Sequence, residues 1–150
     1  MINEIFIGVS KNKIFLVTLS AWAIAQGVKV LLGVIRQKKF DFRWFVGTGG
    51  MPSSHAAGAS CLAVSVGLTY GFDSTLFALA ASFALVVMFD AQGVRRATGR
   101  QARILNKITT DIYWQGRIDE EKLRELVGHT PIEVIAGSLL GAIIAFVAMA

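Results

Sequence analysis

Cysteine, histidine and proline are all scarce in this chain of 150 residues. The one cysteine, Cys61, excludes an internal disulfide and any metal site built on several thiolates. Cys61 lies among alanine, leucine and glycine, so we expect it to be a small core residue. The only two histidines, His55 and His129, are 74 positions apart, so a site that uses both must be assembled by the fold.

Charged residues are also scarce, at 17% of the chain, and four long stretches carry one charge or none. Apolar residues make up 54% and the mean hydropathy is +0.58, which is unusual for a soluble domain of this length. Each stretch is close to the roughly 20 residues that cross the hydrocarbon core. A soluble bundle would need polar faces at helical spacing, and these stretches are apolar all round. We therefore predict a compact all-α membrane bundle of about four transmembrane helices, at residues 14–35, 56–72, 74–94 and 131–150.

The net charge of +5 does not indicate nucleic-acid binding, because the basic residues flank the apolar stretches. Basic residues beside a membrane attract anionic lipids instead. The first linker and the long third linker are basic, whereas residues 71–74 contain no base. With four spans these two linkers share a side, which the positive-inside rule assigns to the cytoplasm. Both termini are then expected outside the cell's inner (plasma) membrane.

This topology brings the two histidines to one membrane face. His55 opens the second apolar stretch and His129 directly precedes the fourth, and both stretches start from the cytoplasmic side. We therefore predict that the two imidazoles meet in a common pocket that faces the cytoplasm.

Two segments outside the spans are expected to lie at the membrane surface. Residues 3–9 are predicted to lie in the interface, and the acidic Glu4 with no basic run argues against a secretory signal peptide. The linker at residues 95–130 has apolar residues at helical spacing, including Ile104, Leu105 and Ile108, which predicts an amphipathic helix. The sequence contains no internal repeat, so we expect residues 1–150 to form one domain.

The first motif is glycine-rich and runs from Gly47 through Pro52 and two serines to His55, at the start of a predicted helix. Glycines let the backbone approach an anion, and a helix N-terminus adds free N–H groups and a positive dipole end. Capping of the helix by Ser53 or Ser54 is the structural alternative. Capping does not explain the glycines and the histidine.

The second motif surrounds His129. Thr130, Pro131 and Glu133 fit a capping box, which is a purely structural role. The capping box does not explain His129. A carboxylate one turn away would orient its ring and stabilise its charged form. Capping and orienting can coexist.

The third motif begins with Asp90 and includes Arg95 and Arg96 at the cytoplasmic end of the third stretch. Asp90 either forms ion pairs with these arginines or has a function, because an acid at a membrane boundary is costly otherwise. Arginine binds phosphate through two parallel hydrogen bonds. The three motifs together predict a phosphate site.

These motifs resemble those of a known family. Pro52-Ser53-Ser54-His55 and His129-x3-Glu133 look like the second and third motifs of the type-2 phosphatidic acid phosphatase superfamily, which shares its fold with vanadium haloperoxidases. Residues 49–55, 90–97 and 128–134 are typical of that superfamily's divergent bacterial and plant branch. The resemblance covers nearly the whole chain, with the three motifs in order.

The resemblance implies an enzyme that needs neither metal nor cofactor. His129 would be the nucleophile that accepts the phosphoryl group, with Glu133 orienting it, and His55 would protonate the leaving oxygen. Ser53 and Ser54, with nearby backbone amides, would hold phosphate oxygens.

The chain departs from the family pattern in its cations. The Lys-x6-Arg-Pro motif is absent; Arg36-x6-Arg43 has the spacing, but with arginine for lysine and Trp44 for proline. The arginine of the usual Ser-Arg pair is replaced by Leu123. Either other cations replace the missing ones or phosphate binding has been lost. We expect phosphate binding by Lys39, Arg43, Arg95 and Arg96, with Asp90 and Gly50 in supporting roles.

The usual six-helix core is reduced to four helices here. Gly137-x3-Gly141 in the last helix predicts close packing against another helix, either of this chain or of a second subunit in a homodimer.

Two functions follow from these observations. The first is a membrane-embedded phosphatase that hydrolyses a lipid phosphate or pyrophosphate through a phosphohistidine intermediate. The alternative is a non-catalytic membrane protein that keeps the scaffold and binds anionic lipid headgroups, which the missing cation motifs favour. A transporter is less favoured, because few ionisable residues lie within the spans.

Overall fold

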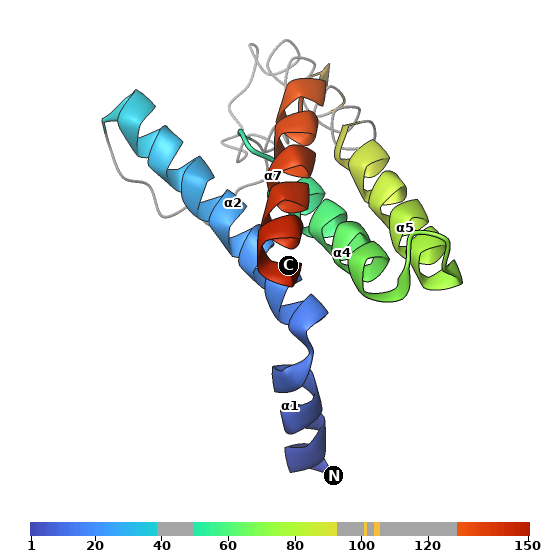
Figure 1. Ribbon diagram of the computed structural model, residues 1–150. Coiled ribbons are helices and arrows are strands. Elements are labelled where there is room, and N and C mark those ends of the chain that lie inside the picture. Colours follow the sequence, from blue (N-terminus) through green and yellow to red (C-terminus); the bar gives the residue numbers. More distant parts are fainter. Residues whose placement is uncertain (39–49, 93–100, 102–103, 106–128) are drawn as a thin grey trace, which may run out of the picture.

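The computed structural model describes residues 1–38, 50–92, 101, 104–105 and 129–150. All regular elements in these ranges are helices, as predicted for a small all-α membrane bundle (Figure 1). Gln101, Ile104 and Leu105 are helical within the linker predicted to be amphipathic, and the rest of that linker is outside the described residues. The helices are α1 (Ile2–Lys11), α2 (Lys13–Gln37), α4 (Ser54–Tyr70), α5 (Thr75–Gln92) and α7 (Pro131–Met149).

Helix α4 is the centre of the bundle and packs against α2, α5 and α7. Small side chains make this possible, because they let neighbouring helix backbones approach closely. Cys61 is fully buried and packs against Ala21 of α2 and Ala145 of α7, as a small core residue would. The buried residues of α4 are Ser54, Ala56, Ala57, Gly58, Ala59, Ser60, Cys61, Ala63, Ser65 and Gly67.

The glycines of α7 pack against α4 of the same chain. A Cβ added to Gly137 would overlap the carbonyl oxygen of Ser53, and one added to Gly141 would overlap that of Ala57. The close helix packing predicted from Gly137-x3-Gly141 is therefore made within one chain. A homodimer would have to use another surface.

Length and composition make α2 (over Lys13–Ile35), α5 and α7 candidate membrane spans among the described residues. Helix α4 has 17 residues, so it is about 26 Å long and lies at the short end of what crosses a hydrocarbon core of about 30 Å. The Ser53 side chain caps the start of α4, and Gly71, with a φ of +93°, ends it. The bundle is thus as predicted, although α4 is shorter than its neighbours.

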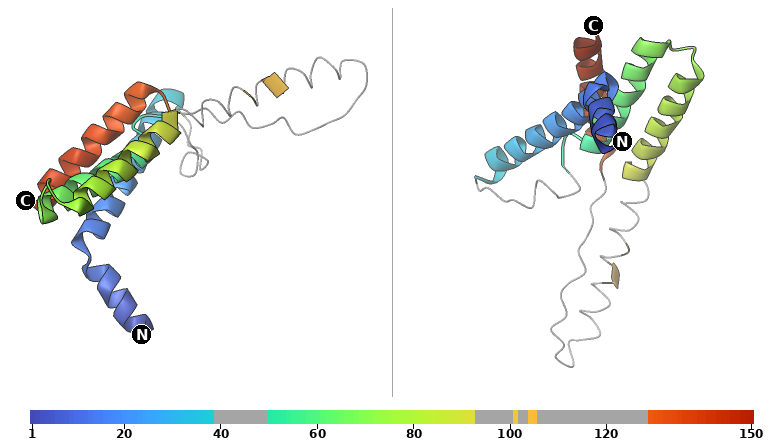
Figure 2. Two further views of the ribbon diagram at one scale, coloured as in Figure 1. Left: turned by 90° about the vertical axis from the view of Figure 1, so that its right-hand side faces the viewer. Right: turned by 90° about the horizontal axis from the view of Figure 1, so that it is seen from below.

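The segment at residues 3–9, which was predicted to lie in the interface, falls within helix α1. The Asn12 side chain accepts a hydrogen bond from Phe15 N–H at 3.0 Å and starts a new helix after α1. Among the described elements α1 contacts only α2, and it extends away from the bundle (Figure 1; left view of Figure 2). The end of α2, the start of α4, the end of α5 and the start of α7 lie at the opposite end (Figure 1).

Candidate functional site

The two histidines meet at the end of the bundle where α4 and α7 begin. Their ring centroids are 6.1 Å apart and the ring planes are tilted by 60°. His129 is almost fully buried, at 1% exposed, whereas His55 is partly exposed. The juxtaposition predicted from the topology is therefore present.

Glu133 has both of the roles considered for it. Its Oε2 accepts a hydrogen bond from Thr130 N–H at 2.9 Å, and Thr130 Oγ1 accepts one from Glu133 N–H at 3.3 Å, so the capping box is complete. The same Oε2 lies 3.2 Å from Nδ1 of His129. An ionised carboxylate only accepts hydrogen bonds, so Nδ1 carries the proton and the lone pair of a neutral His129 is on Nε2.

Backbone hydrogen bonds connect the three motifs to one another. Ser53 N–H donates to the carbonyl of Glu133 at 3.0 Å, which joins the start of α4 to the first turn of α7. His129 N–H donates to the carbonyl of Ala91 at 3.1 Å, which fixes the histidine to the last turn of α5. These bonds hold the His129 backbone in place relative to the start of α4.

The two serines lie at the start of α4 and are buried. Ser53 is the N-cap, and its Oγ accepts a hydrogen bond from Ala56 N–H at 3.3 Å, as the structural alternative predicted. Its hydroxyl proton is still available to donate. Ser54 lies in the first turn beside His55 and lines a groove between the helices.

Lys29 of α2 is a buried cation that the sequence analysis did not select as a candidate. It is only 8% exposed, and its ammonium group donates to Oε1 of Gln26 at 3.1 Å. It lies close enough to Glu133 for a coulombic attraction between the two charges. A Cβ on Gly50, where φ is +88°, would be 3.3 Å from Cγ of Lys29. Glycine at position 50 thus lets the loop pass directly over the lysine stem.

A sequence signal for Lys29 was present. Lys29-x6-Arg36 has the spacing and both cation types of the Lys-x6-Arg-Pro motif, with Gln37 in place of the proline. Arg36-x6-Arg43 has the same spacing, and Arg43 lies outside the described residues. Both Lys29 and Arg36 lie on α2, whose C-terminal end is at the histidine end of the bundle (Figure 1).

The structure describes only some of the remaining predicted site residues. Asp90 lies in the last turn of α5 and is exposed, next to the Ala91 carbonyl that anchors His129. The predicted phosphate ligands Lys39, Arg43, Arg95 and Arg96 are outside the described residues. Within the described ranges, no three His, Cys, Asp or Glu side chains are grouped as a metal site would require.

Comparisons with known proteins identify a matching family model and a similar membrane protein. Residues 10–144 match the family model described as the divergent PAP2 family, PAP2 being the type-2 phosphatidic acid phosphatase. The chain is similar to the uncharacterized membrane protein YuiD of Bacillus subtilis (strain 168), with 41% identity over 141 residues, covering 87% of this chain and 89% of that protein. No solved structure matches the chain.

Proposed function

Because this chain belongs to the divergent PAP2 family of membrane proteins, we propose that it is a phosphatase that hydrolyses a lipid phosphate or diphosphate through a phosphohistidine. The observation that carries the proposal is the pair of histidines with ring centroids 6.1 Å apart, one of them oriented by Glu133. A structural role for His129 would not require a second imidazole at this distance. The reaction needs only groups that these residues supply.

In the first step, Nε2 of His129 attacks phosphorus, and the bond from phosphorus to the leaving oxygen breaks. Protonated His55 donates its proton to that oxygen, so that an alcohol or a phosphate departs. The positive charge that develops on His129 is stabilised by Glu133.

In the second step, water attacks the phosphohistidine. His55, now neutral, takes a proton from this water, and the phosphorus–nitrogen bond breaks. The bonding electron pair returns to Nε2 of His129, and inorganic phosphate leaves. Both residues are then in their starting protonation states.

Charge on the transferring group is stabilised by fixed positive groups, which supply most of the catalysis in phosphoryl transfer. Lys29 and the N-terminus of α4 are suited to this among the described residues. We retain Lys39, Arg43, Arg95 and Arg96 as proposed additional phosphate ligands, and the positive-inside rule favours a site on the cytoplasmic side.

The test is phosphate release by the purified protein from phosphatidic acid, phosphatidylglycerophosphate and a polyprenyl diphosphate. We expect release from at least one of them, and loss of release in His129→Ala with the same elution volume as the wild type. Absence of release from all three, together with no vanadate binding, would leave the protein as a non-catalytic binder of lipid headgroups.

A further inference from the structure

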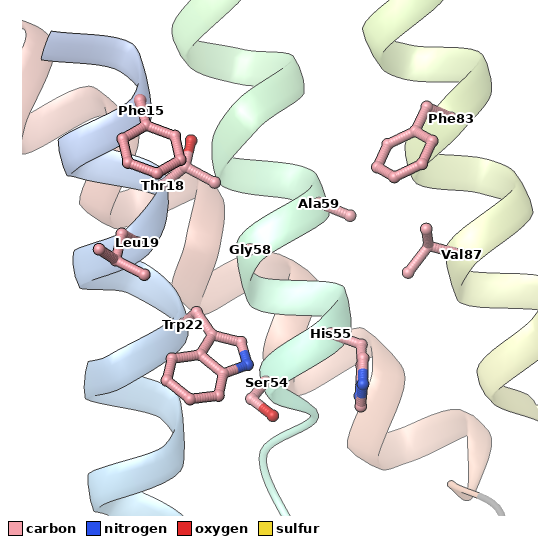
Figure 3. Close-up of a pocket in the computed structure, with 10 residues that line it drawn as sticks. All are labelled: Phe15, Thr18, Leu19, Trp22, Ser54, His55, Gly58, Ala59, Phe83 and Val87. Atoms are coloured by element: carbon pink, nitrogen blue, oxygen red, sulfur yellow. The ribbon is translucent and has the colours of Figure 1, made fainter. Parts of the chain in front are cut away.

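An apolar groove runs along the bundle from the histidine site toward the other end of α2 (Figure 3). Side chains of α2 and α5 form its two walls and α4 forms its floor. Its volume is about 330 Å³, within the usual range for small-molecule sites. It is lined by Phe15, Thr18, Leu19, Trp22, Ser54, His55, Gly58, Ala59, Phe83 and Val87.

The groove is open at the surface of the bundle between α2 and α5, which are both candidate membrane spans. Its walls remain accessible, with Leu19 50% exposed and Phe83 55% exposed, while the floor residues Gly58 and Ala59 are buried. Glycine and alanine on the floor leave space that larger side chains would fill. A hydrocarbon chain in the bilayer can therefore enter between α2 and α5 without crossing a polar surface.

The inner end of the groove is the proposed catalytic site. His55 lines the groove and also faces His129, with ring centroids 6.1 Å apart. Ser54, at the start of α4, lines the same end. A molecule with its apolar chain in the groove would thus have its polar end beside both histidines.

The size of the groove suits a single chain. From Phe15 to Trp22 it follows α2 for about 10 Å, roughly a third of the hydrocarbon thickness. A volume of about 330 Å³ spread over this length makes a narrow groove, which suits one extended hydrocarbon chain.

We propose that this groove holds the first part of one hydrocarbon chain of the substrate, a phosphate or diphosphate monoester of a long-chain lipid. This inference rests on the proposed function and adds the position of the lipid chain. The bilayer is as apolar as the groove, so chain burial adds little affinity. The groove acts by orientation, because it fixes the phosphate between the two histidines, and small misplacements there cost large factors in rate.

The test compares the same substitution on and beside the groove. Val87 lines it, whereas the adjacent Val86 is 66% exposed and does not. Val87→Phe should lower kcat/KM at least about tenfold for long-chain phosphatidic acid or polyprenyl phosphate, and less than about twofold for water-soluble dibutanoyl phosphatidic acid. Val86→Phe should change none of these more than about twofold. The two long-chain substrates distinguish diacyl from polyprenyl chains.

A second pair of variants tests the groove independently, in case Val87→Phe does not fold. Leu19→Trp narrows the opposite wall, and Leu16→Trp, at an exposed position outside the groove, is its control. Equal activity of Leu19→Trp and Leu16→Trp on long-chain lipid would overturn the proposal. The proposal would also be overturned if the groove variants lost the same fraction of activity on long-chain and on soluble substrates. A change of oligomeric state, measured by light scattering, would indicate a second copy in the groove and would overturn it as well.

Occupancy is tested separately from catalysis with a long-chain alkylphosphonate that carries a diazirine near its phosphorus. We expect adducts on groove residues near the histidine end, such as Trp22, reduced in Val87→Phe and unchanged in Val86→Phe (Figure 3). Adducts spread equally over lipid-facing positions such as Phe146 and Val147 of α7 would contradict the proposal. If the wild type cleaves no ester but the adducts lie in the groove, the proposed function fails while the chain site stands.

Discussion

Glu133→Gln separates the two roles of this side chain. Glutamine keeps an oxygen that can accept the Thr130 N–H, so the capping box persists and we expect the stability to change by less than about 1 kcal/mol. The substitution removes the negative charge beside His129. A hydrogen bond to a charged group is worth about 1 kcal/mol more than a neutral one, which is about fivefold to tenfold in rate.

The loss should be larger than this lower bound. Attack on phosphorus places positive charge on His129, and the carboxylate 3.2 Å from Nδ1 is positioned to stabilise it. The carboxylate also fixes the tautomer with the lone pair on Nε2, whereas the glutamine amide can donate to Nδ1 and favour the other tautomer. In a serine protease the corresponding Asp-to-Asn change costs about 10⁴-fold. We therefore expect kcat to fall by between about tenfold and about 10⁴-fold.

Thr130→Ala is the matched control, because it removes the cap and leaves the carboxylate in place. It should lower the stability by about 1 kcal/mol and leave most of the activity. The assay is phosphate release from a lipid phosphate in detergent micelles, paired with thermal unfolding of each variant. Full activity in Glu133→Gln, or activity that falls in proportion to stability in both variants, would refute the reasoning.

Three further variants test other parts of the site and the bundle. His55→Ala should slow the first-turnover release of an alkoxide leaving group strongly and that of 4-nitrophenolate much less, since only the poor leaving group needs its proton; equal losses in a rapid-quench assay of the two leaving groups would exclude an acid role. Lys29→Met should lower activity by about tenfold or more while leaving thermal stability equal or higher, because an apolar side chain is often as stable as a buried charge; unchanged activity would remove Lys29 from the site. Gly141→Ala should destabilise the bundle by about 1–3 kcal/mol in thermal unfolding, because its Cβ would overlap the Ala57 carbonyl. Gly27→Ala should not, because a Cβ at that position has no neighbour within 4 Å. Equal stability of the two variants would contradict the packing described.

The sequence predicted most of the bundle because its helix signals are strong and local. The last stretch was predicted at residues 131–150 and found at Pro131–Met149, since Thr130, Pro131 and Glu133 define its start by capping. Residues 3–9 were predicted as a separate segment without a defined structure, and the boundary between α1 and α2 depends on one capping side chain, Asn12. The Gly137-x3-Gly141 spacing predicted close packing, but it carries no information about which helix is the partner.

The candidate site was predictable in its histidines and less so in its cations. Four apolar stretches were enough to bring His55 and His129 to one end, because consecutive membrane spans run in opposite directions. Lys29 was overlooked because a single charge in an apolar stretch does not reveal its depth in the membrane. Its place near the end of α2, beside Gly50 and Glu133, depends on how α2 packs against α7 and the loop.

In the proposed mechanism, His129 carries the phosphoryl group during turnover. Rapid quenching of the protein with a ³²P-labelled lipid phosphate, followed by mass spectrometry under alkaline conditions that preserve phosphohistidine, tests it directly. We expect phosphate on the His129 imidazole, accumulating in His55→Ala when a good leaving group is used, because that variant lacks the base for the second step. Steady release of phosphate with the label on another residue, or on none, would contradict it.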